Sequence, residues 1–140
     1  MAISWSAPTF NFRSVVPMLD AEVRINQASR RVNFIVDTGS TYTIIQLPQV
    51  ASLLDVIPDR RDLVQVGGIA ADLSGNPLMG FSTSVTIEIA PGCSYVEPEA
   101  WISPNVHWSV LGTHSFFRNH GFCVWNWENN SRFKVFQRAN

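Results

Sequence analysis

Apolar and polar residues alternate with a period of two along much of the chain. The alternation is cleanest over residues 81–89, where one face reads Phe, Thr, Val, Ile, Ile and the other reads Ser, Ser, Thr, Glu. Residues 19–26 and 31–37 show a similar pattern. Because successive side chains of a strand point to opposite faces of its sheet, each of these segments is predicted to be a half-buried strand.

Turns and a first helix are predicted between such strands. Residues 26–29 (Asn-Gln-Ala-Ser) indicate a turn, and residues 47–54 favour one short helix. Toward the end of the chain, residues 122–127 and 132–136 flank Glu128-Asn129-Asn130-Ser131. Two apolar runs around such polar turn formers predict a closing β-hairpin.

A second short helix is predicted over residues 115–120, with Ser115 as its N-cap and Gly121 as its C-terminal glycine. Many short strands interrupted by Gly and Pro predict an all-β closed barrel or sandwich. The chain has 140 residues, of which 46% are hydrophobic, enough to fill one core. We therefore predict one domain over residues 17–140, preceded by an arm or edge strand over residues 1–16.

Charge changes this picture by removing some functions. Ten Lys and Arg balance eleven Asp and Glu, for a net charge of −1, so there is no electrostatic footprint for a nucleic acid or an anionic membrane. Charged residues make up 15% of the chain, against roughly 25% in an average protein, which favours a self-association surface. No secretory signal pattern and no apolar run of roughly 18 residues is found, so we expect a soluble cytoplasmic protein.

The clearest functional signal lies where an apolar strand ends in Asp37. A carboxylate there is costly unless something stabilises it. Thr38 supplies a hydroxyl donor, Gly39 lets the backbone approach closely, and Ser40 can donate to a carboxylate oxygen. These residues suit an acid held at the floor of a cleft. The alternative is an ordinary turn after a strand, since Asp, Thr and Gly all favour turns.

The flanking motifs, taken in order, resemble the retropepsin-like aspartic proteases, the family of retroviral proteases and their cellular and bacterial relatives. The Asp motif is Val36-Asp37-Thr38-Gly39-Ser40, and a second strand follows over residues 42–45. The family's apolar-apolar-Gly motif is similar to Val110-Leu111-Gly112, which precedes the predicted helix. The resemblance covers residues 17–137 and implies a closed barrel with one or two short helices.

The same resemblance implies a flap hairpin over residues 63–80 that closes over the substrate. The flap and substrate-binding residues would be Val66, Gly67, Gly68 and Ile69. A polypeptide in extended conformation would bind under this hairpin by strand addition. Thr38 would lock two copies of the Asp loop together, and the Gly39 carbonyl would receive the substrate backbone. No metal or other cofactor is implied.

An aspartic endopeptidase needs two acids that share one proton, one to activate water and one to polarise the scissile carbonyl. The chain holds a single Asp-Thr-Gly, and the nearest imitation, Asp72-Leu73-Ser74-Gly75, has an extra residue and falls in the predicted flap. The resemblance therefore implies a homodimer in which Asp37 faces its own copy across a twofold axis.

The sequence departs from retroviral enzymes at Thr41 and Thr113, where those enzymes usually carry an acid and an Arg that form an ion pair. This loss leaves a second hypothesis open: a catalytically weak or inactive dimeric peptide-binding or scaffold module with the same fold. The intact Asp37 motif argues against it, since a scaffold does not require an acid there.

A metal site built from His107, His114, His120 and Cys123 is a third reading, but their spacing matches no zinc pattern. Cys93 and Cys123 are interpreted as buried structural thiols. With a neutral charge balance, the indole side chains are expected in the core or a dimer interface rather than on a nucleic-acid stacking platform. These residues are Trp101, Trp108, Trp125 and Trp127.

Overall fold

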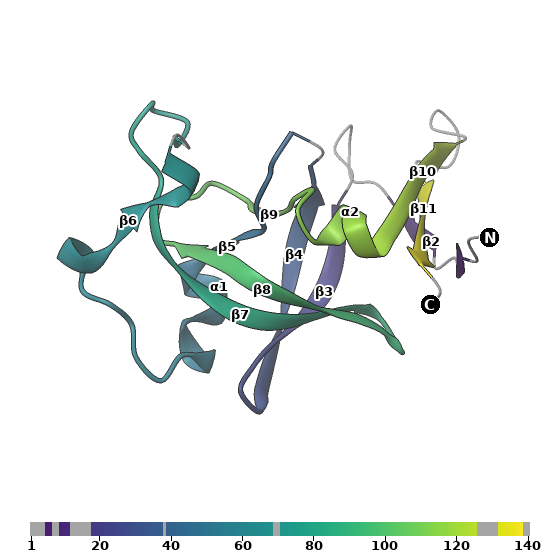
Figure 1. Ribbon diagram of the computed structural model, residues 1–140, viewed down its shortest axis with the longest axis horizontal. Helices are drawn as coiled ribbons and strands as arrows, with labels where there is room; N and C mark the ends of the chain where they lie inside the picture. The colour runs from purple at the N-terminus through teal and green to yellow at the C-terminus, as the bar shows by residue number, and fades with distance from the viewer. Residues whose placement is uncertain are drawn as a thin grey trace.

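The computed structural model describes residues 5–6, 9–11, 18–37, 39–68, 71–125 and 132–138, most of which lie in strands (Figure 1). The strands are β1 (Trp5–Ser6), β2 (Thr9–Asn11), β3 (Met18–Ile25), β4 (Ala28–Val36), β5 (Ile44–Gln46), β6 (Val64–Gln65), β7 (Met79–Ala90), β8 (Cys93–Ser103), β9 (Ser109–Leu111), β10 (His120–Trp125) and β11 (Arg132–Arg138). The helices are α1 (Leu47–Val50), α2 (Phe116–Asn119) and the 3₁₀ segments η1 (Ala51–Leu53), η2 (Arg60–Asp62) and η3 (Val66–Gly68). The predicted all-β fold with short helices is confirmed.

Six strands close into a barrel in the order β3-β4-β9-β5-β8-β7, and β3 pairs again with β7 to complete the circle. Most neighbours are antiparallel, but β4 runs parallel to β9 and β5 runs parallel to β8. Strand β6 pairs with β7 outside this circle. The predicted closed barrel is therefore confirmed, and β4 and β9 end side by side.

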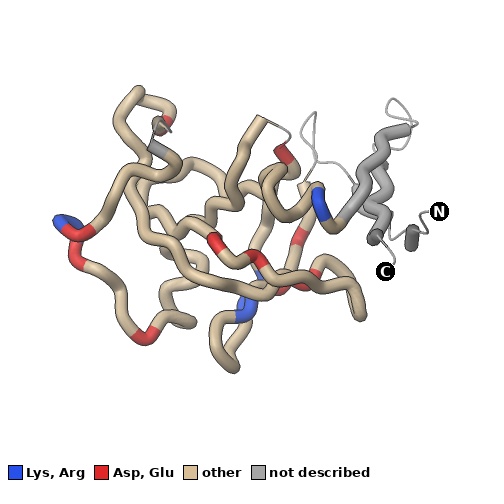
Figure 2. The backbone as a smooth tube through the Cα atoms, in the orientation of Figure 1, with Lys and Arg blue, Asp and Glu red and all other residues tan. Residues whose placement is uncertain are grey.

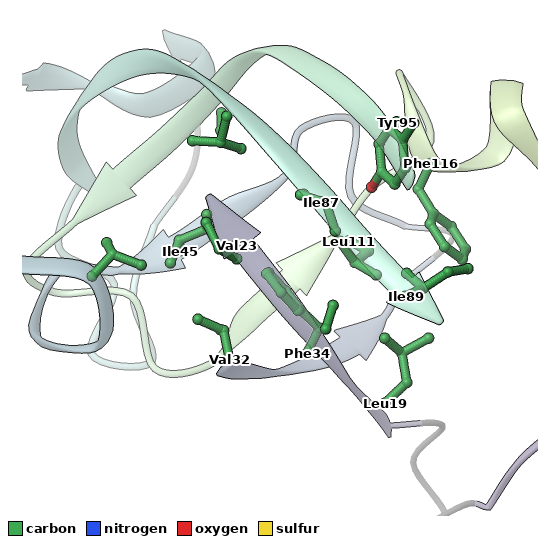
Figure 3. Packing of buried hydrophobic residues seen from close by; sticks show 14 of the residues in the cluster. Leu19, Val23, Val32, Phe34, Ile45, Ile87, Ile89, Tyr95, Leu111 and Phe116 are labelled. Carbon is green, nitrogen blue, oxygen red and sulfur yellow. The ribbon is translucent and has the colours of Figure 1, made fainter. Parts of the chain in front are cut away.

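Side chains from alternate strand positions fill the barrel. Positions along β3 alternate between buried and more exposed, as its sequence pattern predicts. Phe34 of β4 and Ile87 of β7 are fully buried, and Figure 3 shows them among the apolar side chains inside the barrel. Complete burial of such a side chain stabilises the fold by about 1.5–3 kcal/mol, so this cluster holds the strands in register.

Two local predictions differ in detail from the structure. The first turn spans only Asn26 and Gln27, and β4 already begins at Ala28. Asn26 has a φ of 56°, a left-handed conformation that asparagine tolerates better than most residues, and it makes the two-residue turn possible. Gly121 belongs to β10, where it pairs with Phe136, so it does not end the helix as predicted.

The predicted helix over residues 47–54 is present as α1 followed by η1, and it starts at a proline-containing first turn. The second predicted helix is present as α2. Ser115, the predicted N-cap, donates its hydroxyl to Oε1 of the buried Glu97 at 2.8 Å. The segment that precedes α2 is thereby tied to the barrel interior.

A second sheet contains β1, β2, β10 and β11. Strands β10 and β11 are antiparallel, which confirms the pairing predicted for the closing hairpin. Its predicted turn over residues 128–131 lies outside the described residues. Strands β1 and β2 both pair with β11, so the described parts of residues 1–16 are strands of this sheet. Its outermost described residues, Trp5 and Arg138, pair with each other.

Charged residues are scattered along the described backbone, and both signs occur at several places (Figure 2). This distribution agrees with the balanced charge of the whole sequence. Within the described parts of the chain, no helix has the length and apolar character needed to cross a membrane.

Candidate active site

The residues singled out by the Asp motif lie around one cavity of about 530 Å³. Asp37, Gly39 and Ser40 line it from the loop that follows β4. Val66 and Gly67 line it from the segment after β6. Val110 of β9 and several apolar residues complete the wall. Thr38 and Ile69, which were predicted to belong to the same site, lie outside the described residues.

Asp37 is placed by the parallel pairing of β4 with β9. Val36 lies opposite Leu111, and the Asp37 amide donates to the Leu111 carbonyl at 3.0 Å. The amide of Gly39 donates to Oδ1 of Asp37 at 2.8 Å. A hydrogen bond to an ionised acceptor is stronger than a neutral one, so this amide both orients and stabilises the carboxylate. Asp37 is only partly buried, which leaves it open to water in the cavity.

Two backbone hydrogen bonds join the loop after Asp37 to the segment after β9. The amide of Thr113 donates to the Ser40 carbonyl at 2.8 Å, and the amide of His114 donates to the Thr41 carbonyl at 2.9 Å. The backbones of Thr41 and Thr113 thus take part in the hydrogen bonds between these two segments. These two bonds connect the same two segments that the ion pair would join in retroviral enzymes.

Gly112 is required by this close approach. A Cβ atom there would lie 2.4 Å from the Tyr42 carbonyl oxygen and 2.7 Å from the Ser40 carbonyl oxygen. Leu111 and Gly112 therefore support the site from behind, while Val110 faces the cavity. The Ser40 hydroxyl donates to the Tyr42 carbonyl at 2.7 Å. The expected bond from Ser40 to the Asp37 carboxylate is therefore not formed. The Ser40 hydroxyl stabilises the loop instead of the acid.

The described part of residues 63–80 is a hairpin beside the cavity, in which β6 pairs with β7. Val64 pairs with Gly80, and the Val66 amide donates to the Leu78 carbonyl at 2.8 Å. Gly67 has a φ of 60°, and a Cβ there would lie 2.8 Å from Cε2 of Tyr42, so the glycine packs closely against this ring. Gly68 ends η3 directly after it.

The end of this hairpin is the turn over residues 72–76, and not the Gly67-Gly68 pair. Ala71 and Pro77 form an isolated antiparallel bridge just before that turn. The Asp72-Leu73-Ser74-Gly75 sequence, which imitates the Asp-Thr-Gly motif, is therefore a turn with no position in the cavity for its acid.

An apolar wall lines the same cavity as Asp37. Buried side chains of Ile44, Val66 and Leu78 pack together, with Tyr42 and Val110 against them. The Tyr42 ring also meets Trp101 edge to face, with ring centroids 6.2 Å apart. Nothing in the local sequence marks Tyr42 as a site residue. This wall gives the cavity the chemistry to accept an apolar side chain.

Tryptophan and cysteine predictions are partly resolved. Trp101 packs against the apolar wall, but the Trp108 side chain is 51% exposed, so it is not a core residue. Trp127 and the side chains of Trp125 and Cys123 lie outside the described part. Cys93 is buried as predicted, and burial, followed by the nearby Glu88 charge, raises the pKa of its thiol.

Among the described residues, no three His, Cys, Asp or Glu side chains gather into a potential metal site. His107 and His114 are exposed, and the side chain of His120 is outside the described part. Of the described residues that line the cavity, Asp37 carries the only carboxylate. Any two-acid chemistry in this cavity therefore requires a carboxylate from elsewhere.

Comparison with known proteins gives support at the level of the fold. No protein-family model matches the chain, and no curated protein matches its sequence. Among solved structures, a retropepsin-like aspartic protease from Rickettsia conorii superimposes with a TM-score of 0.62 at 15% sequence identity. The match covers 100% of this chain and 98% of that chain. The chain therefore has the retropepsin-like fold.

Proposed function

We propose that this protein is an aspartic endopeptidase whose active unit is a homodimer. The observation that carries the proposal is the Asp37 carboxylate, held by the Gly39 amide at the edge of a cavity under a hairpin. The fold it shares with the Rickettsia conorii protease supports the same reaction class. Among the described residues, the Gly39 amide donates to the Asp37 carboxylate, and no Lys or Arg forms an ion pair with it.

The reaction needs a pair of acids. One carboxylate takes a proton from the attacking water while the protonated partner polarises the scissile carbonyl. Two carboxylates in contact resist holding two charges, so they share one proton at mildly acidic pH. Among the described residues that line the cavity, Asp37 carries the only carboxylate. A second copy of the chain, related by a twofold axis, would therefore supply the other acid.

The substrate is an extended polypeptide. It would lie between the Asp37 loop and the hairpin, with main-chain hydrogen bonds to the Gly39 carbonyl and to the segment Val66–Ile69. Thr38 from each copy would join the two loops across the axis. The apolar wall around Ile44 and Val110 would take a hydrophobic side chain beside the scissile bond.

Replacing Asp37 with asparagine tests the chemistry. The variant Asp37→Asn keeps the shape and the hydrogen bond from Gly39 but removes the proton acceptor, so cleavage of an unstructured polypeptide should fall by about 10³-fold or more. The matched control is Asp59→Asn, because Asp59 is exposed and pairs only with Arg61. Peptide cleavage at wild-type rate by Asp37→Asn would exclude an aspartic mechanism.

Dilution tests the dimer. If each copy supplies one acid, specific activity should fall as the protein dissociates, in step with the dimer fraction measured by sedimentation. Constant specific activity in a fully monomeric sample would contradict the shared pair. Tight peptide binding without cleavage at any pH would instead support the peptide-binding module.

A further inference from the structure

The side-chain amide of Asn105 makes an unusual number of hydrogen bonds to the hairpin. Asn105 lies between β8 and β9. Its Oδ1 accepts from the Met79 amide at 3.0 Å and from the Ser103 hydroxyl at 3.1 Å. Its Nδ2 donates to the Pro77 carbonyl at 3.0 Å and to Oδ2 of Asp72 at 3.4 Å. One side chain thus contacts the hairpin turn at Asp72 and the second arm of the hairpin at Pro77 and Met79.

Asp72 uses its other oxygen to order the hairpin turn. Oδ1 of Asp72 accepts from the amides of Ser74 and Asn76, each at 2.9 Å. The Asp72 amide donates to the Asn76 carbonyl at 2.7 Å, and the Gly75 amide donates to the Asp72 carbonyl at 3.0 Å. Asp72 is therefore a rigid end point for the bond from Asn105.

The charged form of Asp72 is favoured by these contacts. Desolvation tends to raise the pKa of the Asp72 carboxyl, but hydrogen bonds from Asn76, Ser74 and Asn105 outweigh it and lower the pKa below its usual value. An ionised acceptor strengthens the hydrogen bond that Nδ2 of Asn105 donates.

Each hairpin residue that Asn105 contacts is adjacent in sequence to a residue that lines the cavity. Ala71, which precedes Asp72, lines the cavity, and so does Leu78, which lies between Pro77 and Met79. Val106, which follows Asn105, lines it as well. We propose that Asn105 is a positioning residue that sets the distance between the hairpin and the Asp37 loop, and through it the affinity for the peptide. This role rests on the proposed peptidase function.

The variant Asn105→Asp is the sharpest test, because it keeps the shape and the Oδ1 acceptor but removes both donors. It also places a second carboxylate beside Asp72. We expect the amides of Val66 and Asp72, which donate within the hairpin, to exchange about tenfold faster with solvent. KM for a peptide substrate should rise about five- to tenfold, while kcat stays within about twofold of wild type.

The chain offers a matched control and a matched rescue. Asn33 donates to Asp20 at 2.8 Å across β3 and β4, so Asn33→Asp creates the same carboxylate pair away from the hairpin. It should leave hairpin exchange and KM unchanged. Adding Asp72→Asn to Asn105→Asp restores a donor between the two side chains but not the bond to the Pro77 carbonyl, so it should return exchange and KM part of the way to wild type.

Two results would overturn the inference. One is unchanged hairpin exchange in Asn105→Asp, and the other is faster exchange with unchanged KM. Failure of the double variant to recover would also count against the pairing with Asp72. Amide exchange does not depend on cleavage, so a wild-type protein that cleaves no peptide refutes the proposed function, and exchange alone then decides whether Asn105 holds the hairpin.

Discussion

Replacing Gly112 with alanine should damage the protein through a contact that is visible in the structure. The new methyl group would lie 2.4 Å from the Tyr42 carbonyl oxygen and 2.7 Å from the Ser40 carbonyl oxygen. Both neighbours are backbone atoms, which cannot rotate away as the end of a side chain can. The loop that carries Asp37 must therefore move away from the segment after β9.

The cost follows from the bonds that this movement breaks. The amides of Thr113 and His114 each donate to a carbonyl of the displaced loop, at 2.8 and 2.9 Å. Each lost bond costs about 0.5–1.5 kcal/mol, and overpacking a tight site adds about 1–3 kcal/mol. We expect Gly112→Ala to lower the free energy of unfolding by about 2–6 kcal/mol, together with a large loss of cleavage.

Urea unfolding followed by tryptophan fluorescence measures this loss, since the chain has five tryptophans. All variants must be compared at one protein concentration, because the stability of the proposed dimer would depend on it. The control is Gly92→Ala: Gly92 has a φ of 75° but no atom within 4 Å of an added Cβ, so it reports backbone strain alone, about 1 kcal/mol. If Gly112→Ala costs no more than Gly92→Ala, the steric argument is wrong.

Two further predictions concern Tyr95 and Gly67. Burial and then the charge of Glu97 raise the pKa of Tyr95 well above its usual 10.0, although a hydrogen bond with Thr43 opposes this. The protonated Tyr95 therefore contributes stability that is complete below pH 10 and is lost as the pH rises further. Phenylalanine cannot ionise, so alkaline unfolding of Tyr95→Phe should need a higher pH than that of wild type. The absorbance of tyrosinate is measured against pH in wild type and in Tyr95→Phe. Identical curves of structural loss against pH for the two proteins would contradict the prediction. Gly67→Ala should raise KM severalfold, because the methyl group would press on the Tyr42 ring, whereas Gly75→Ala, with a similar φ of 82° but open space around it, should not; equal KM values would refute that contact.

Strands with one apolar face could be predicted from the sequence, but β8 could not. β7 and β3 alternate cleanly because their polar positions face away from the core. In β8, the inward position after Cys93 and Tyr95 is Glu97, an acid that is only 1% exposed. The buried positions then change phase before Ala100, where the pairing with β7 shifts register. Neither feature has a signal in local alternation.

In the candidate site, too, some features could be predicted from the sequence and others could not. Asp37 and Gly39 could be predicted because their contact is local and the residue types report it. The contact between Gly67 and Tyr42, and the bonds of Asn105 to the hairpin, depend on how separate strands are placed. An asparagine in a loop is typical of a turn, and nothing in the nearby residues distinguishes it from one that joins the turn of a hairpin to its second arm.

The parallel pairing of β4 with β9 also has a kinetic consequence. The Asp37 amide is satisfied by Leu111, and the Ser40 carbonyl by Thr113, so the loop acquires its bonds only when two distant parts of the chain meet. Long-range parallel contacts carry a large loop-closure entropy and form late in folding. A chain still emerging from the ribosome therefore has no ordered Asp37 loop until β9 has been synthesised. Under the proposed peptidase function, newly made chains would thus be spared from hydrolysing one another before β9 has been synthesised.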